Sequence, residues 1–150
     1  MVGTKKLFIF TDGAARGNPG EAGAGIYIRD EQDTLVEKSV YLGNTTNNVA
    51  EYLAFLIGLS EAAALGGACL CLHSDSELLV RQMQGRYRVK DKKLQPLFEK
   101  AKKVLSEFPR YEISHIRREE NREADRLANR AIDERSSADQ GFLARSGSAV

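Results

Sequence analysis

The first third of the chain alternates short apolar runs with turn-forming residues. Apolar runs at 7–11, 24–29 and 34–42 are separated by a Gly-Asn-Pro-Gly sequence at 17–20 and by a polar loop at 30–33. Apolar runs of this length predict strands, and strands joined by such short connections pair antiparallel. This part of the sequence therefore predicts an antiparallel meander of three strands.

Helical and extended patterns alternate in the rest of the chain. They predict helices over 49–65, 74–84, 91–107 and 121–134, and strands over 68–73 and 111–116. In the first of these helices, the spacing of apolar residues favours one face made of Val49, Leu53, Leu56, Ile57, Ser60 and Ala64. A strand that follows a helix can lie parallel to an earlier strand. We therefore expect an α/β fold: a five-stranded mixed sheet, three antiparallel strands followed by two parallel additions, with helices on both faces.

The length of 150 residues fits a single domain. We expect this domain to cover residues 1–134, because 135–150 has few apolar and several small polar residues, which is typical of a flexible C-terminal tail. No apolar run reaches the roughly 18 residues of a membrane span, and the start lacks a signal-peptide pattern. We expect a cytoplasmic monomer with no membrane partner and no evident protein partner, in which Cys69 and Cys71 are buried and unlinked.

The charge is unevenly distributed along the chain. The formal net charge is +1, but residues 81–103 contain nine basic and two acidic residues. This segment therefore carries +7, which leaves −6 for the rest of the chain. A basic segment attached to an acidic body is compatible with a polyanionic partner, because the basic side chains can contact phosphates.

Four carboxylates lie at positions that suggest chemistry. Asp12 ends the first apolar run, Asp75 follows the fourth predicted strand, and Asp125 borders the packed face of the last helix. Glu51 is the one charged residue between 49 and 59, where burial of an unpaired carboxylate would be costly. Structural explanations also exist for each residue alone: a turn at Asp12-Gly13, capping boxes at Asn48-x-x-Glu51 and Ser74-x-x-Glu77, and pairing of Asp125 with Arg122 or Asn129.

Taken together, the four carboxylates suit the binding of divalent cations. Mg²⁺ and Mn²⁺ prefer oxygen ligands with high charge density. Two such ions held about 3.5–4 Å apart activate a water molecule and stabilise the leaving oxygen of a phosphodiester. The sequence shows no Ser-His-Asp or Cys-His nucleophile set, and His73 and His115 fall in strand-like runs.

Four motifs of the chain resemble those of type 1 ribonuclease H, in the family's order. They are Thr11-Asp12-Gly13 with Gly17-Asn18-Pro19-Gly20, Thr45-Thr46-Asn47-Asn48-x-x-Glu51, Ser74-Asp75-Ser76, and Asn121-x-Glu123-Ala124-Asp125-x-Leu127-Ala128. Together they span about residues 5–134 and resemble the small, prokaryotic type. The resemblance implies that Asp12, Glu51, Asp75 and Asp125 bind two Mg²⁺, with Mn²⁺ as a substitute. It also implies hydrolysis of the RNA strand of RNA–DNA hybrids, leaving 5′-phosphate and 3′-hydroxyl ends.

The resemblance further implies which residues contact the hybrid. Asn18, Asn47 and Asn48 would contact the minor groove, where 2′-hydroxyls are displayed, with Ser76 beside Asp75 as a further substrate contact. Thr46 would help to hold a phosphate of the DNA strand. Arg86, Lys92 and Lys93, which lie near Tyr87, are candidates for a basic substrate-binding surface; an ordinary solvated surface is the alternative.

Three features depart from the family's pattern. Glu77 replaces the glutamine that follows the Asp-Ser pair in many members, and a carboxylate cannot donate a hydrogen bond. The stretch 117–121 is short and lacks the histidine of the family's loop, so Glu120 or solvent would have to replace that histidine. The chain also has no Trp, whereas some members carry a Trp-rich basic protrusion.

Other functions remain compatible with parts of the pattern. The same fold could act on double-stranded RNA or a DNA junction, or could bind hybrids without cleaving them. The presence of all four acids argues against a pure binding module, because negative charge repels phosphates. An actin-like ATPase core would need a duplicated domain, for which the chain is too short.

Overall fold

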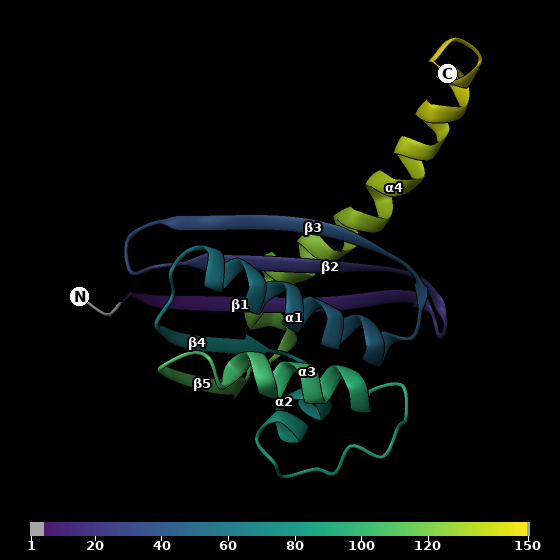
Figure 1. Ribbon diagram of the computed structural model, residues 1–150. Helices are drawn as coiled ribbons and strands as arrows, with labels where there is room; N and C mark the ends of the chain where they lie inside the picture. Colours follow the sequence, from purple (N-terminus) through teal and green to yellow (C-terminus); the bar gives the residue numbers. More distant parts are fainter. Residues whose placement is uncertain (1–4, 150) are drawn as a thin grey trace.

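Five strands form one mixed sheet in the order β3-β2-β1-β4-β5 (Figure 1). The computed structural model describes residues 5–149, and for 136–149 it describes the backbone alone. The strands are β1 (Lys6–Gly17), β2 (Gly20–Arg29), β3 (Thr34–Thr45), β4 (Cys69–Ser74) and β5 (Arg110–His115). The helices are α1 (Asn47–Ala64), α2 (Glu77–Met83), α3 (Gln95–Leu105), the 3₁₀ turn η1 (Arg118–Glu120) and α4 (Arg122–Ala149).

The pairing of β1 determines which part of its edge has no neighbouring strand. β1 pairs with β2 in antiparallel fashion from Phe8 opposite Arg29 to Gly17 opposite Gly20, the last residue of β1. It pairs with β4 in parallel only as far as Thr11 opposite Ser74. Beyond Thr11, β1 therefore has a free edge, and the next residue is Asp12. The predicted fold class, three antiparallel strands with two parallel additions, is confirmed.

Helices cover the two faces of the sheet in different ways. Ile9, Ile26 and Leu72 are buried on the face that packs against α1. On the other face α4 crosses β2 so closely that a Cβ on Gly25 would overlap the carbonyl of Ala124. The glycine at position 25 is therefore required by helix packing, and it brings the start of α4 against the sheet.

The buried face of α1 differs from the predicted one. The buried residues of α1 are Ala50, Glu51, Tyr52, Ala54, Phe55, Gly58, Leu59 and Ala62. Of the predicted face, Val49, Leu53, Leu56 and Ile57 are only partly buried, and Ser60 and Ala64 are exposed. The helix carries apolar residues nearly all round, so the spacing alone cannot select the face that packs on the sheet.

The boundaries of several elements also differ from the predictions. β1 continues through Asp12 to Gly17, and α3 begins at Gln95 rather than near residue 91. α4 continues to Ala149, past the predicted end near Glu134, and its second half extends away from the sheet (Figure 1). The division into a domain over 1–134 and a flexible tail over 135–150 stays a prediction.

Two smaller points concern membrane spans and cysteines. Over residues 5–149, no helix combines the length and the apolar character needed to span a membrane.

Cys69 and Cys71 are free thiols, as predicted, but both are half-buried rather than buried. Their side of β4 faces the part of the sheet that α4 covers least, because α4 contacts mainly β2.

Candidate active site

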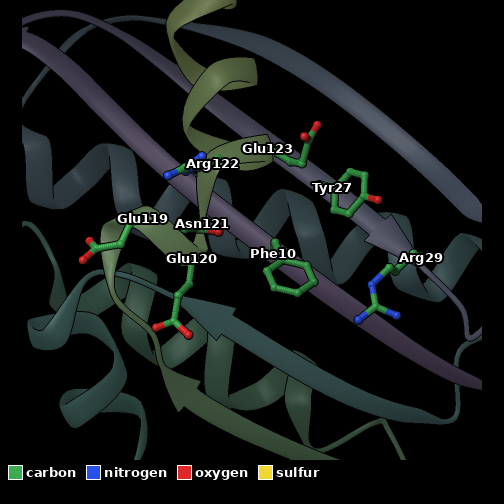
Figure 2. Close-up of a pocket in the computed structure, with 8 residues that line it drawn as sticks. All are labelled: Phe10, Tyr27, Arg29, Glu119, Glu120, Asn121, Arg122 and Glu123. Atoms are coloured by element: carbon green, nitrogen blue, oxygen red, sulfur yellow. The ribbon is translucent and has the colours of Figure 1, made fainter.

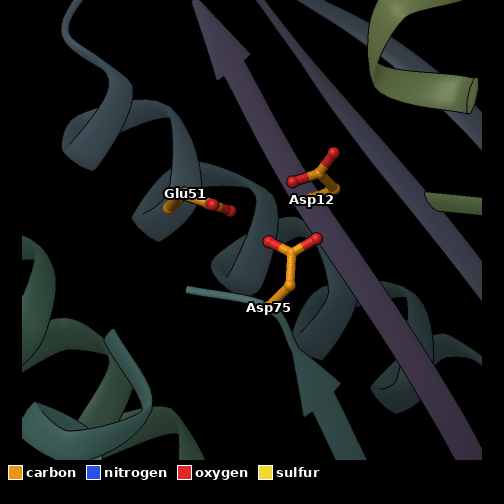
Figure 3. A group of neighbouring side chains, drawn as sticks. All are labelled: Asp12, Glu51 and Asp75. Atoms are coloured by element: carbon orange, nitrogen blue, oxygen red, sulfur yellow. The ribbon is translucent and has the colours of Figure 1, made fainter. Parts of the chain in front are cut away.

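Three carboxylates from three different elements meet at the free edge of β1. Asp12 lies in β1, Glu51 in the second turn of α1, and Asp75 directly after β4. Each offers one oxygen atom, and these oxygen atoms all lie within 4.8 Å of one another. Figure 3 shows the three side chains converging. The end of the β1–β4 ladder thus brings together residues that are 39 and 24 positions apart in the sequence.

Glu51 is held in place by the backbone of β1. The N–H of Gly13 donates a hydrogen bond of 2.8 Å to Oε1 of Glu51, which is 6% exposed. The predicted alternative, that Glu51 caps its own helix, is wrong: Thr46 is the N-cap residue, and its hydroxyl oxygen accepts from the N–H of Val49. The carboxylate of Glu51 therefore faces Asp12.

Asp125, from the first turn of α4, lines the same cavity as the other three carboxylates. This cavity has a volume of about 340 Å³ and is lined by all four predicted carboxylates. The side-chain amide of Asn129, one turn further along α4, donates to Oδ1 of Asp125 at 3.4 Å. A guanidinium nitrogen of Arg118 lies 3.6 Å from the same oxygen. The structure thus brings Asp125 next to the other three carboxylates, although it is not part of their closest group.

Burial and mutual repulsion raise the pKa values of Asp12, Glu51 and Asp75. Burial, together with the charges of Asp75 and Asp125, raises the pKa of Asp12 to about 8. Burial and the charge of Asp12 also raise the pKa of Glu51, against the opposing effect of the Gly13 N–H. The pKa of Asp75 is raised by burial and lowered by a hydrogen bond from Asn121. Such a cluster gains free energy when cations are placed among the carboxylates.

The residues present fit the binding of hard divalent cations. The cavity offers oxygen atoms from carboxylates, together with the amides of Asn47 and Asn129, and lacks thiolate or imidazole ligands among the described residues. The close approach of three buried or half-buried carboxylates without a matching number of cationic side chains is the observation that supports this fit.

Asn121 is a site residue that the sequence analysis did not select. Its side chain is 1% exposed, and its Nδ2 donates to Oδ2 of Asp75 at 3.3 Å and to the carbonyl of Thr11 at 3.0 Å. The residue belongs to one of the quoted motifs, but its contacts depend on where β4 leaves β1. That position is not visible in a hydrophobicity pattern.

Several of the predicted substrate-contact residues adjoin residues that line this cavity, in the sequence or through a hydrogen bond. Oδ1 of Asn18, in the β1–β2 turn, accepts from the N–H of Asn47 at 3.1 Å, which ties this turn to the start of α1. Asn47 lines the cavity, and Asn48 follows it as an exposed residue of α1. Thr46 and Ser76 are the N-cap residues of α1 and α2.

The basic residues separate into two groups. Arg86, Lys92 and Lys93 are exposed on the connection between α2 and α3, apart from the carboxylate cavity. Arg118 and Arg16, which the sequence analysis did not select, line the carboxylate cavity itself. Arg16 is held by an ion pair of 2.8 Å with Asp133 of α4.

Glu120 lies away from the carboxylate cavity. Its carboxylate accepts from the backbone N–H of Arg117 at 3.0 Å, and it lines a second cavity of about 230 Å³. Figure 2 shows that this second cavity lies between the aromatic side chains of Phe10 and Tyr27 and the start of α4. Arg118 rather than Glu120 therefore occupies the rim beside the carboxylates.

Comparison with known proteins places these features in a family. A family model described as reverse transcriptase-like matches residues 10–131. A bifunctional protein of Mycobacterium tuberculosis is 42% identical over 130 residues, which are 85% of this chain but 36% of that protein. The chain thus spans about a third of the length of the mycobacterial relatives it matches.

Two further similarities cover nearly the whole of the relative. A ribonuclease H of Coxiella burnetii is 34% identical over 148 residues, which cover 85% of this chain and 90% of the relative. A crystal structure of an RNase H1 isolated from compost, in complex with an RNA/DNA hybrid, is 46% identical and superposes with a TM-score of 0.81, covering 85% of this chain and 97% of that one.

Proposed function

The chain belongs to the type 1 ribonuclease H family, and we propose that it is an endonuclease that hydrolyses the RNA strand of RNA–DNA hybrids. The observation that carries this proposal is the group formed by Asp12, Glu51 and Asp75, whose oxygen atoms lie within 4.8 Å of one another. Support comes from the related RNase H1 that was solved with an RNA/DNA hybrid. We propose products with 5′-phosphate and 3′-hydroxyl ends.

The proposed cofactor is a pair of Mg²⁺ ions, for which Mn²⁺ could substitute. Asp12, Glu51, Asp75 and Asp125 would hold them, because all four carboxylates line the same cavity. When bound, two such ions activate a water molecule and stabilise the leaving oxygen of a phosphodiester. The four side chains supply four formal negative charges, which match two divalent ions.

The residues at the mouth of the cavity would select the hybrid. Asn18 and Asn47 are linked by a hydrogen bond, and with Asn48 they present amides that can donate to and accept from 2′-hydroxyls. Ser76, beside Asp75, would contact the same strand. The hydroxyl of Thr46, at the N-terminus of α1, would help to hold a phosphate of the DNA strand.

Basic side chains would assist the binding of the hybrid at two places. Arg86, Lys92 and Lys93 would contact phosphates of the hybrid away from the reaction centre, because they are exposed on the α2–α3 connection. Arg118 would act at the rim of the cavity, where its guanidinium lowers the pKa of Asp12 and Asp75 by its positive charge. We propose that Arg118 helps to attract the scissile phosphate in place of the family's loop histidine.

All four carboxylates come from one chain, which supports a monomeric enzyme. We propose a cytoplasmic monomer that acts without a protein partner. The alternatives are double-stranded RNA as the substrate and binding of hybrids without cleavage.

The direct test is cleavage of a hybrid with a labelled RNA strand. The wild-type chain with Mg²⁺ should cut the RNA strand, and EDTA should stop the reaction. Asp12→Asn should abolish cleavage while leaving hybrid binding largely intact, because it removes a metal ligand rather than a substrate contact. Cleavage that persists in EDTA or in this variant would contradict the proposed mechanism, and binding without cleavage by the wild-type chain would favour a binding module.

A further inference from the structure

Asn121 occupies the point where β4 separates from β1. The β1–β4 ladder ends with Thr11 opposite Ser74. The carbonyl of Thr11 then accepts from Nδ2 of Asn121 at 3.0 Å, so a side chain takes the place of the next strand residue. The same Nδ2 donates to Oδ2 of Asp75 at 3.3 Å.

The two acceptors fix the orientation of the Asn121 amide. A flipped amide would place Oδ1 against a carbonyl oxygen and a carboxylate oxygen, which is repulsive. With Nδ2 facing both acceptors, Oδ1 is buried and has no hydrogen-bond partner among the described residues. A buried acceptor without a partner costs free energy, and such groups are rare in folded proteins. The position is therefore occupied by a double donor, and not merely by a side chain that fills space.

The backbone of Asn121 makes a second connection. Its carbonyl accepts from the N–H of Asp125 at 3.0 Å, in the first turn of α4. Asn121 thus bonds directly to Asp75, to Asp125 and to Thr11, the residue before Asp12. In Figure 3 the carboxylate of Asp75 points toward Asp12 and Glu51, which is the orientation that the Asn121 bond supports.

From this geometry we infer that Asn121 is a positioning residue that sets the affinity of the carboxylate cluster for divalent cations. This inference rests on the proposed metal site. One oxygen of Asp75 is engaged by Asn121, which restricts the rotation of the carboxylate and leaves the other oxygen for the cation. Partners that orient metal-binding side chains typically change metal affinity or activity by about 10–100-fold when they are removed.

The variant that isolates this role is Asn121→Leu. Leucine has nearly the same shape, so the packing is kept, but both donated hydrogen bonds and the unpartnered oxygen disappear. The measurement is Mn²⁺ binding without nucleic acid, followed by the electron paramagnetic resonance signal of free Mn²⁺, with thermal unfolding of the metal-free protein as the check on folding. We expect the dissociation constant for Mn²⁺ to rise about 10-fold or more, while the unfolding temperature changes by only a few degrees.

Gln82→Met provides a matched control. Gln82 is also a buried amide, at 3% exposed, and its Oε1 accepts from the hydroxyl of Tyr52 at 2.6 Å, but it lies on α2 outside the carboxylate cavity. Its replacement should lower the unfolding temperature and leave Mn²⁺ binding unchanged. A purely structural role of Asn121 would give the same result for both variants.

The outcomes separate the inference from the proposed function. Mn²⁺ binding by folded Asn121→Leu within twofold of wild type would overturn the positioning role while leaving the metal site intact. Absence of Mn²⁺ binding in the wild-type chain would overturn both. If Asn121→Leu does not fold, Asn121→Ser, which keeps one donor on a shorter side chain, is measured instead. Its Mn²⁺ binding is judged by the same twofold limit.

Discussion

The backbone N–H of Gly13 donates a 2.8 Å hydrogen bond to Oε1 of Glu51, and this bond joins the central strand to the first turns of α1. The contact is possible only because the two backbones nearly touch: a Cβ on Gly13 would overlap the carbonyl of Ala50. The bond thereby fixes Glu51 to Gly13, the residue that follows Asp12 in the chain. The relationship explains why a buried glutamate on an apolar helix is tolerated.

Gly13→Ala should therefore damage both stability and activity. The added methyl group has to push α1 away from β1, which breaks the bond to Glu51 and moves that carboxylate away from Asp12. We expect a fall in the unfolding temperature of several degrees and a loss of hybrid cleavage of at least 10-fold. Gly43→Ala is the control, since a Cβ there meets no atom within 4 Å and costs only the strain of its positive φ, about 1–2 kcal/mol. Equal effects of both substitutions would argue against the close contact.

Asp12→Asn should stabilise the metal-free protein at alkaline pH. The pKa of Asp12 is raised by burial and by nearby carboxylates from its usual 3.8 to about 8, so the folded state holds this proton more tightly than the unfolded state does. Stability contributed by this group is therefore lost as pH rises from about 4 to 8. The variant should be more stable than wild type by about 1–3 kcal/mol at pH 8, with a difference that shrinks toward pH 4. Thermal unfolding in EDTA across this range measures the effect.

Mg²⁺ should reverse the order of stability of wild type and Asp12→Asn. Cations among the carboxylates favour their charged forms, so saturating Mg²⁺ should raise the unfolding temperature of wild type more than that of Asp12→Asn. Glu119→Gln, which alters an exposed carboxylate outside the cluster, is the control and should behave as wild type does. A stability difference that is independent of both pH and Mg²⁺ would show that the cluster is not the cause.

Arg118→Gln should reduce the efficiency of cleavage without affecting the fold. The side chain is 78% exposed, so little packing is lost, but its guanidinium lies 3.6 Å from Asp125 at the rim of the cavity. Removing this charge should lower kcat/KM for the hybrid by about 10-fold, since attraction to the phosphate is weakened. Arg117→Gln is a matched control, because Arg117 pairs with Glu120 rather than with the cluster. Indistinguishable kinetics of the two variants would show that Arg118 has no role in the proposed site.

The double variant Lys92→Glu with Lys93→Glu should weaken hybrid binding in a salt-dependent way. Both lysines are exposed on the α2–α3 connection. If they contact phosphates, the slope of log affinity against log salt becomes shallower by about 1 for each lost contact. Charge reversal of Lys5, just before β1, and of Lys6, its first residue, is the control, because both lie outside the α2–α3 connection and the carboxylate cavity. An unchanged slope would show that the basic segment is an ordinary solvated surface that does not contact phosphates.

The sequence allowed the sheet to be predicted because its strands carry clear signals. Apolar runs of five to nine residues were bounded by Gly, Asn, Asp and Pro, and the helix before β4 implied that this strand lies parallel to β1. The buried face of α1 could not be predicted, because a helix that is apolar nearly all round gives no preferred direction. The pattern predicts a start near Val49, whereas α1 begins at Asn47, because the cap at Thr46 lies in a run of polar residues that each can cap a helix.

The four carboxylates could be found because an acid in an apolar context is unusual and because the motifs occur in the family's order. Asn121 and Arg118 could not be found in the same way. Asn121 matters because the β1–β4 ladder ends at Thr11, and Arg118 matters because η1 turns it toward Asp125. Both facts depend on distances between segments that are far apart in the sequence, which local periodicity does not contain.

The central claim is best tested by comparing three duplexes in one assay: an RNA–DNA hybrid, double-stranded RNA and double-stranded DNA of the same sequence. Wild-type chain and Asp75→Asn are incubated with each duplex in Mg²⁺, and the ends of the products are determined. The account predicts that wild type cuts the RNA strand of the hybrid alone, leaving 5′-phosphate and 3′-hydroxyl ends, and that Asp75→Asn cuts none of the duplexes. Equal cleavage of double-stranded RNA, or cleavage of the hybrid by Asp75→Asn at the wild-type rate, would contradict it.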